Sequence, residues 1–380
     1  MSSTGNGNGV MGRLVSLDAL RGFDMFFIIG GGGKRLFEGL TKGFHSSFLE
    51  KLLPQFEHGP WVPGYGVWAA GFTFWDIIMP LFLFCSGTSM PYSFSKFLKR
   101  GGTKKQLYMK VLRRVLILFL LGMIKQGHLL LFDLGELHIY SNTLQAIGAG
   151  YLIAALIYLN FNLRWQIIIT SGLLLLYWAL LALVPVPGYG AGVLTPDGNL
   201  AIFLDKLILG RFEDGLDYTW ILSSMVFGCS VMLGVLAGEL IRMPMTDKNK
   251  LFWMFGIGAG AVILGLVWSP FFPIIKYIWT SSMVLYAGGI CFILLGLFYL
   301  IIDVQGYKKW AFGFMVIGMN SITAYMGEKF FKFDYTANTL LGGLDKWMGD
   351  WASFLHAVLI FGIIWSILYL MYRTKTFLKI

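Results

Sequence analysis

The chain has 380 residues, of which 57% are hydrophobic and 13% charged, and its mean hydropathy is +0.69. A soluble domain carries about 25% charged residues, so this composition excludes a soluble protein and predicts an integral membrane protein. The formal net charge is +10, which we attribute to membrane topology rather than to nucleic-acid binding. The three cysteines lie in apolar runs and show neither a disulfide framework nor metal-ligand spacing.

Apolar runs long enough to cross a bilayer recur along the chain. We therefore predict an all-α fold, a polytopic transmembrane bundle of about ten helices. Residues 1–12 are expected to form a disordered tail, and residues 13–380 a single domain. The helices are predicted over residues 17–34, 72–95, 107–126, 139–160, 164–184, 218–241, 251–269, 278–302, 310–331 and 353–373.

The loops on the two sides of this bundle differ in basic residues. The side that holds the N-terminus has 18 Lys and Arg residues against 11 on the other side, and eight of the 18 lie between Lys96 and Arg114. Because basic loops stay in the cytoplasm, both termini are predicted to be cytoplasmic, in a multi-pass protein of the inner membrane. The loop that contains His58 then faces the opposite side.

The stretch from residue 54 to residue 91 contains the strongest catalytic candidates. His58 lies in a loop rich in Gly, Pro and aromatic residues, and Asp76 lies just inside the start of the next apolar run. A histidine is suited to act as a base near neutral pH, and a carboxylate at the mouth of a membrane helix is costly unless it is paired or faces water. The alternatives are a solvated loop histidine and a carboxylate that favours the helix N-terminus.

Other polar and aromatic residues are candidates for ligand binding. Arg113 and Arg114 end the densest basic patch and suit a nucleotide phosphate, although topology alone also explains them. Arg21 can pair with neighbouring acids or contact a phosphate. The remaining candidates are amides and a lysine in apolar surroundings, which can also bond neighbouring helices, and aromatic residues that can stack on a sugar or lie at the membrane interface; they are Gln145, Asn320, Lys276, Trp61, Tyr65 and Trp68.

Several motifs in this order resemble the transmembrane acetyltransferases typified by heparan-alpha-glucosaminide N-acetyltransferase. They are Arg13 to Gly22 (RLVSLDALRG), a glycine run ending in Lys34, Trp75-Asp76, Pro80 to Phe84 (PLFLF), Leu144 to Gly148 (LQAIG), Pro273 to Ser282 (PIIKYIWTSS) and Gly318 to Ser321 (GMNS) with Tyr325. The resemblance covers most of the chain. It implies transfer of an acetyl group from cytoplasmic acetyl-CoA to an amino sugar on the other side of the membrane.

The resemblance also implies roles for individual residues. His58 and Trp61 match the catalytic His-x-x-Trp motif and Asp76 matches the family's Asp, but His58 lies 18 positions before Asp76, so residues 62–70 would be an insertion. An alignment without a gap places Tyr65 at the histidine position instead. Ile29 stands where the family has an upstream Asn. Neutral imidazole could act as a base or carry the acetyl group covalently.

We therefore predict an acetyl-CoA-dependent N-acetyltransferase that acts on glucosamine or a glucosamine-containing saccharide. The catalytic residues are His58 and Asp76. The substrate-binding residues are Trp61, Trp68, Lys276, Trp279 and Asn320, and the acetyl-CoA-binding residues are Arg21, Arg113, Arg114 and Gln145. No metal and no nucleic-acid partner is predicted, and a homodimer is left open. The alternative is a transporter of an amino sugar such as N-acetylglucosamine, in which His58 and Asp76 form a proton-coupled gate.

Overall fold

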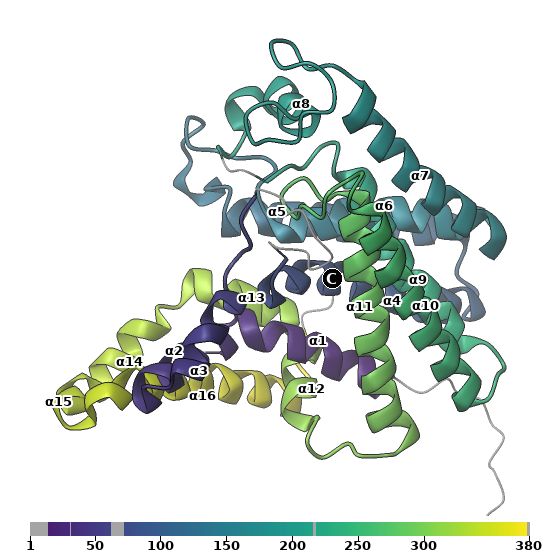
Figure 1. Ribbon diagram of the computed structural model, residues 1–380. Helices are drawn as coiled ribbons and strands as arrows, with labels where there is room; N and C mark the ends of the chain where they lie inside the picture. The colour runs from purple at the N-terminus through teal and green to yellow at the C-terminus, as the bar shows by residue number, and fades with distance from the viewer. Residues whose placement is uncertain (1–13, 31, 62–71, 216–217, 378–380) are drawn as a thin grey trace, which may run out of the picture.

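A computed structural model describes residues 14–30, 32–61, 72–215 and 218–377. The regular secondary structure of the described residues is helical, without a β-strand, and Figure 1 shows how the helices pack together. The α-helices are α1 (Val15–Ile28), α2 (Gly33–Phe44), α3 (Ser47–Leu52), α4 (Ile78–Lys99), α5 (Lys104–Lys125), α6 (Thr143–Asn160), α7 (Leu163–Leu183), α8 (Leu200–Leu209), α9 (Ser224–Arg242), α10 (Asp247–Trp268), α11 (Ser281–Phe298), α12 (Phe312–Met319), α13 (Ser321–Phe330), α14 (Phe333–Leu341), α15 (Asp345–Met348) and α16 (Ala352–Arg373).

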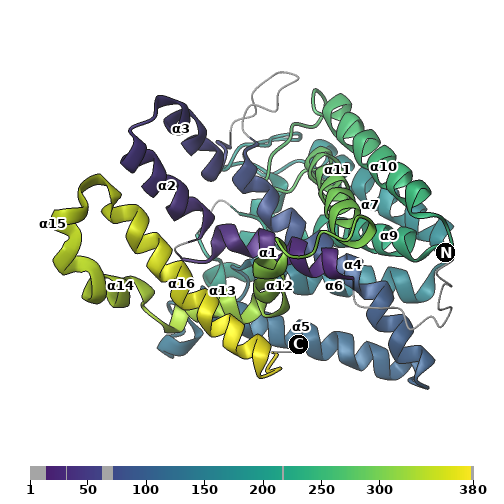
Figure 2. The ribbon, with the colours of Figure 1, turned by 90° about the horizontal axis from the view of Figure 1, so that it is seen from below.

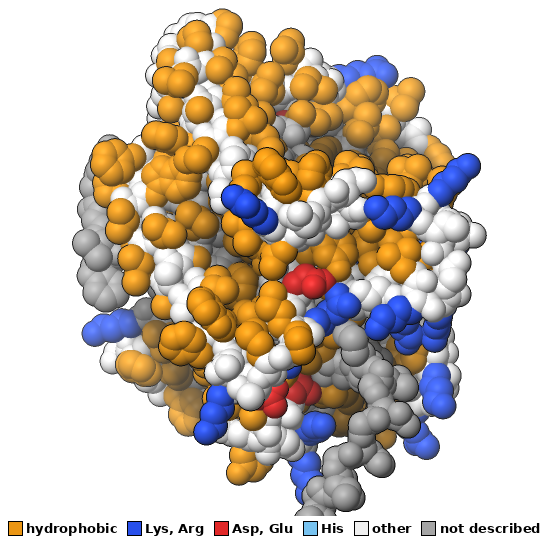
Figure 3. Space-filling view, turned by 90° about the vertical axis from the view of Figure 1, so that its right-hand side faces the viewer, with side chains coloured by type: hydrophobic (Ala, Val, Ile, Leu, Met, Phe, Trp, Pro, Cys, Tyr) orange, Lys and Arg blue, Asp and Glu red, His pale blue; other side chains and the backbone are white. Residues whose placement is uncertain are grey.

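Seven helical segments within the described residues are long and apolar enough to cross a membrane. The segments that contain α7, α10 and α16 are the least buried inside the molecule. Their outer faces carry large exposed apolar side chains such as Leu175, Ile263 and Leu370. In Figure 3, hydrophobic side chains cover much of one face of the molecule. These helices confirm the all-α, multi-pass membrane fold.

The helices gather into two packed groups. α4, α6 and α9 form the centre of the larger group, and α11 packs against α4 and α9. Figures 1 and 2 both place α2, α3, α14, α15 and α16 together at one end of the molecule. α1 joins the two groups because it packs against α4 on one side and α12 on the other.

Glycine permits the close packing of α1 against α12. A Cβ atom placed on Gly22 would lie 1.6 Å from the backbone oxygen of Phe314, and one on Gly318 would lie 1.9 Å from the backbone oxygen of Asp18. Any side chain at either position would therefore push the two helices apart. This contact holds the start of α13, which follows α12, beside α1.

Each of the ten predicted helices overlaps a helix in the structure, although seven segments among the described residues are long and apolar enough to span a membrane. Most ends agree within about four residues, and three predicted helices differ more. α1 ends at Ile28 rather than at residue 34, just before the glycines that begin at Gly30. α9 begins at Ser224 rather than at residue 218, and in the segment before it the backbone N–H groups of Trp220 and Ile221 donate to the Asp205 carboxylate. The helix predicted over 310–331 is broken at Asn320 into α12 and α13.

Candidate active site

Asp76 is fixed at the start of the helix that contains α4. The 3₁₀ turn Phe74–Ile77 precedes α4 and begins with a capping box, in which the backbone N–H of Thr73 donates to Oδ2 of Asp76 over 3.1 Å. The backbone N–H of Gly59 donates to the same oxygen, also over 3.1 Å. The side chain is only 2% exposed, so these bonds leave Oδ1 as the oxygen that faces the neighbouring loops.

His58 and Lys276 meet at that oxygen. Nδ1 of His58 lies 2.9 Å from Oδ1 of Asp76, and Nζ of Lys276 lies 3.2 Å from Oδ1 and 2.9 Å from Nδ1. His58 and Asp76 lie 18 positions apart in the sequence, and Lys276 lies 218 positions after His58. The structure thus brings together His58 and Asp76, which are predicted from the sequence as catalytic residues, and Lys276, which is predicted only as a substrate-binding residue.

Lys276 is held in the segment between α10 and α11. Its side chain is 6% exposed, and burial lowers the pKa of its ammonium group to about 8, although the nearby Asp76 carboxylate acts in the opposite direction. Trp279, in the left-handed region at φ 50°, anchors this segment because its indole N–H donates to Oγ of Ser230 over 3.0 Å. Trp279 is 1% exposed and does not line the cavity described below, so the structure places it behind Lys276.

Aromatic side chains surround this cluster. Trp61 stacks on Tyr277 with ring centroids 4.9 Å apart, and its indole N–H donates to the Leu194 carbonyl oxygen over 2.8 Å. The Tyr277 hydroxyl donates to the carbonyl oxygen of Gly59, next to His58. Trp61 therefore supports the loop that contains His58, and it does not line the cavity. Trp68 and Tyr65 lie outside the described residues.

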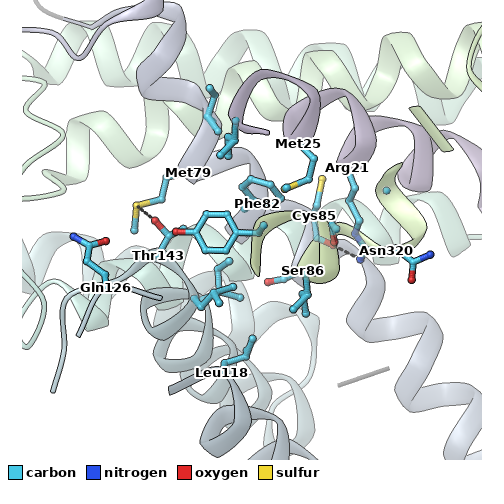
Figure 4. A pocket seen from close by; sticks show the side chains of 18 of the residues that line it. Arg21, Met25, Met79, Phe82, Cys85, Ser86, Leu118, Gln126, Thr143 and Asn320 are labelled. Carbon is cyan, nitrogen blue, oxygen red and sulfur yellow. Dashed lines mark hydrogen bonds between the residues drawn. The ribbon is translucent and has the colours of Figure 1, made fainter. Parts of the chain in front are cut away.

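A cavity of about 550 Å³ begins at His58 and Lys276 and extends into the bundle. It follows one face of the helix that contains α4, which contributes Trp75, Ile78, Met79, Phe82, Cys85, Ser86 and Ser89. The 14 positions from the first to the last of these residues correspond to about 20 Å of helix. The cavity is therefore elongated and leads from the His58 cluster toward the opposite end of α4. Figure 4 shows its middle part, with Phe82, Cys85 and Ser86 beside Arg21 and Asn320.

The two arginines predicted to hold acetyl-CoA together have different environments. Arg114 lines the cavity, its guanidinium lies 4.3 Å from the centroid of the Tyr151 ring, and its buried Nε has no hydrogen-bond partner among the described residues. Arg113 is exposed and does not line the cavity. Arg21 lines the cavity and donates to the Cys85 carbonyl oxygen over 3.0 Å (Figure 4). Arg21 also pairs with Asp18, 3.8 Å away, as one of the two interpretations of the sequence predicts. Both arginines place positive charge beside the cavity.

The two predicted amides also separate. Asn320 is 2% exposed, lines the cavity at the break between α12 and α13, and its amide oxygen and nitrogen have no partner in the described chain. Gln145 is fully buried, completes the capping box at the start of α6, and its Oε1 accepts from the backbone N–H groups of Ser141 and Asn142. Gln145 does not line the cavity, so its place in the structure is that of a helix cap.

Several residues that line the cavity are not among those predicted from the sequence. Tyr218 lies beside Lys276, with its ring centroid 5.9 Å from Nζ. Trp220 also lines the cavity, and its backbone N–H donates to the Asp205 carboxylate. Ser141 contributes a buried hydroxyl without a partner among the described residues. The aromatic and polar residues at 218–220 just before an apolar run were the only signal available in the sequence for this wall.

Comparisons with known proteins show which sequences this chain resembles. Residues 58–197, which begin at His58, match the family described as heparan-alpha-glucosaminide N-acetyltransferase, catalytic. The heparan-alpha-glucosaminide N-acetyltransferase of Homo sapiens is 26% identical over 97% of this chain and 60% of its own length. That of Mus musculus is 26% identical over 85% of this chain and 55% of its own length. The chain thus spans little more than half of these relatives. It is a relative of the heparan-alpha-glucosaminide N-acetyltransferase family.

Proposed function

We propose that this chain is a membrane acetyltransferase that transfers an acetyl group from acetyl-CoA to the amine of glucosamine or of a glucosamine-containing saccharide. The observation that carries this proposal is the elongated cavity, which joins the His58, Asp76 and Lys276 cluster to the arginines inside the bundle. The names of the two relatives support the reaction and the class of acceptor.

The residues that line the cavity fit an elongated donor with anionic and amide groups. Arg114 and Arg21 supply positive charge suited to phosphate oxygens. The unpartnered amide of Asn320 and the unpartnered hydroxyl of Ser141 are suited to polar groups along the donor's chain, because buried polar groups without a hydrogen bond are costly. Acetyl-CoA supplies the reactive thioester. We place the thioester near His58 and the nucleotide toward Arg114, on the side predicted to be cytoplasmic.

His58 is the proposed base. Its Nδ1 faces Asp76, so Nε2 is the nitrogen left to take a proton from the acceptor amine as the amine attacks the acetyl carbonyl. Asp76 orients the imidazole and stabilises its protonated form, as the acid of a catalytic triad does. The proton taken from the amine then passes to the departing thiolate sulfur. An acetyl-imidazole on His58 is the alternative covalent route.

A transfer assay tests this function. The full chain, reconstituted in lipid nanodiscs, is supplied with radiolabelled acetyl-CoA and glucosamine, and labelled N-acetylglucosamine is measured. Loss of a general base lowers the rate by roughly 10² to 10⁴, so His58→Ala should lose measurable transfer and keep acetyl-CoA binding. His356→Ala is the matched control, because Nε2 of His356 lies 2.8 Å from Oδ1 of Asp345, an equivalent pair remote from the cavity.

The same assay can overturn the proposal. Full transfer activity in His58→Ala would remove His58 as the base. If the wild-type chain forms no N-acetylglucosamine but carries labelled N-acetylglucosamine into sealed vesicles, the chain is a transporter.

A further inference from the structure

Nδ1 of His58 makes two close contacts, and each contact requires a different protonation state of this nitrogen. Nδ1 lies 2.9 Å from both Oδ1 of Asp76 and Nζ of Lys276. A neutral imidazole carries one N–H, and its other nitrogen only accepts. Nδ1 can therefore donate to Asp76 or accept from Lys276, but it cannot do both. The protonation state of Lys276 decides which of the two arrangements satisfies the cluster.

When Lys276 is an ammonium, every hydrogen on Nζ is a donor. The short contact to Nδ1 then requires a lone pair on Nδ1, because two N–H groups facing each other repel. The imidazole proton must lie on Nε2, and Lys276 can donate to Nδ1 and to Oδ1 of Asp76 at the observed distances. In this arrangement Nε2 has no lone pair, so His58 cannot take a proton from an acceptor amine.

When Lys276 is a neutral amine, the same distances accommodate the opposite tautomer. Nζ can donate to Oδ1 of Asp76 and turn its lone pair toward Nδ1–H. Nδ1–H then donates to Oδ1 and is shared with Nζ, and Nε2 carries the free lone pair. Conversion between the arrangements moves one proton from Nζ to Nδ1 and releases the Nε2 proton to water, so the cluster loses one proton in all.

We propose that Lys276 is a positioning residue that sets the tautomer of His58, so that the ammonium form switches the base off and the neutral amine switches it on. This inference rests on the proposed function for its consequence in catalysis, but the tautomer itself can be measured without any reaction. Because burial lowers the pKa of Lys276 to about 8, the switch lies within the range of pH at which enzymes are assayed.

Among the described residues, few charged or titratable side chains lie near Lys276. His58 and Asp76 face it from the segment that leads into α4, and the Tyr218 ring lies with its centroid 5.9 Å from Nζ. Tyr277 follows Lys276 in the chain and bonds to Gly59. Behind Tyr218, Asp205 and Asp214 both bond to Trp220. Asp76 is thus the carboxylate in direct contact with the ammonium among the described residues, and its charge opposes the effect of burial.

Nitrogen-15 NMR of histidine-labelled protein in nanodiscs tests the tautomer directly. His58→Gln identifies the His58 signals among the five histidines. At pH 7 the wild type should show the proton on Nε2, and raising the pH to about 9.5 should move it to Nδ1. Lys276→Met should show it on Nδ1 at both pH values, and Lys250→Met, which removes a lysine paired with Asp247 at 3.7 Å, should match the wild type. A wild-type tautomer that is the same at both pH values would overturn the proposal.

The rate of transfer at saturating acceptor and donor gives an independent readout. A lysine with a pKa of about 8 is roughly one-tenth neutral at pH 7, so the wild-type rate should rise about tenfold between pH 7 and pH 9. Lys276→Met should lose this rise. Lys276→Arg keeps its charge at every pH, so it should be less active than Lys276→Met throughout. A purely structural or substrate-binding ammonium predicts the reverse order, and observing that order would overturn the proposal.

The two readouts separate this inference from the proposed function. If no variant and no wild-type sample transfers acetyl groups but the tautomer changes as described, the proposed function fails and the role of Lys276 in setting the tautomer stands. If transfer depends on His58 but the tautomer is insensitive to Lys276, the positioning role fails and the proposed function stands.

Discussion

Adjacent arginines with opposite environments give the sharpest test of where the donor binds. Arg114 lines the cavity and its buried Nε lacks a hydrogen-bond partner among the described residues, whereas Arg113 is exposed on the same helix. The two substitutions Arg114→Gln and Arg113→Gln remove the same charge from nearly the same point in the chain. Only the first removes a charge from the cavity.

The expected change in acetyl-CoA affinity is that of one hydrogen bond made by the Arg114 guanidinium. A hydrogen bond to a charged group contributes about 1.5–3 kcal/mol, which corresponds to a change in Kd of roughly 10- to 150-fold. Arg114→Gln should weaken acetyl-CoA binding by about this factor. Arg113→Gln should change Kd less than about threefold, because an exposed charge is screened by solvent and salt.

Isothermal titration of acetyl-CoA into the nanodisc-reconstituted protein measures both constants, and thermal unfolding checks that each variant is folded. A larger loss of acetyl-CoA affinity in Arg113→Gln than in Arg114→Gln would place the nucleotide on the exposed basic patch and contradict binding in the cavity. Equal affinities for the wild type and Arg114→Gln would refute the assignment of Arg114 to the donor.

Two further outcomes are expected. Gly22→Ala should destabilise the fold by at least the 1–3 kcal/mol typical of overpacking, because its Cβ would meet backbone rather than a flexible side chain. Gly362→Ala, with open space around the residue, should be neutral or stabilising in the same thermal unfolding assay. Equal destabilisation by the two substitutions would refute this packing argument. Cysteine labelling tests the topology, because the native cysteines are buried. A cysteine at exposed Ser47 should react with an impermeant reagent in intact cells, and one at exposed Lys248 should react only after lysis. The opposite pattern would reverse the predicted orientation.

The sequence by itself determined the class of fold. Hydrophobic runs of membrane-spanning length are a local property, since each helix satisfies its own backbone hydrogen bonds in the bilayer. The ten predicted helices therefore recur in the structure. The larger differences occur at helix ends, as before α9, where the backbone N–H groups of Trp220 and Ile221 donate to the carboxylate of Asp205, 15 and 16 positions earlier in the chain.

The sequence also pointed to His58 and Asp76, because a carboxylate at the start of an apolar run is costly and a loop histidine titrates near neutral pH. It did not separate Arg113 from Arg114, Asn320 from Gln145, or Lys276 from Trp279. Each pair contains residues of similar type or position, and the direction of a side chain depends on which helices pack against it. Only the tertiary structure, which brings Lys276 to a histidine 218 positions away, decided which side chains face the cavity and which support its walls.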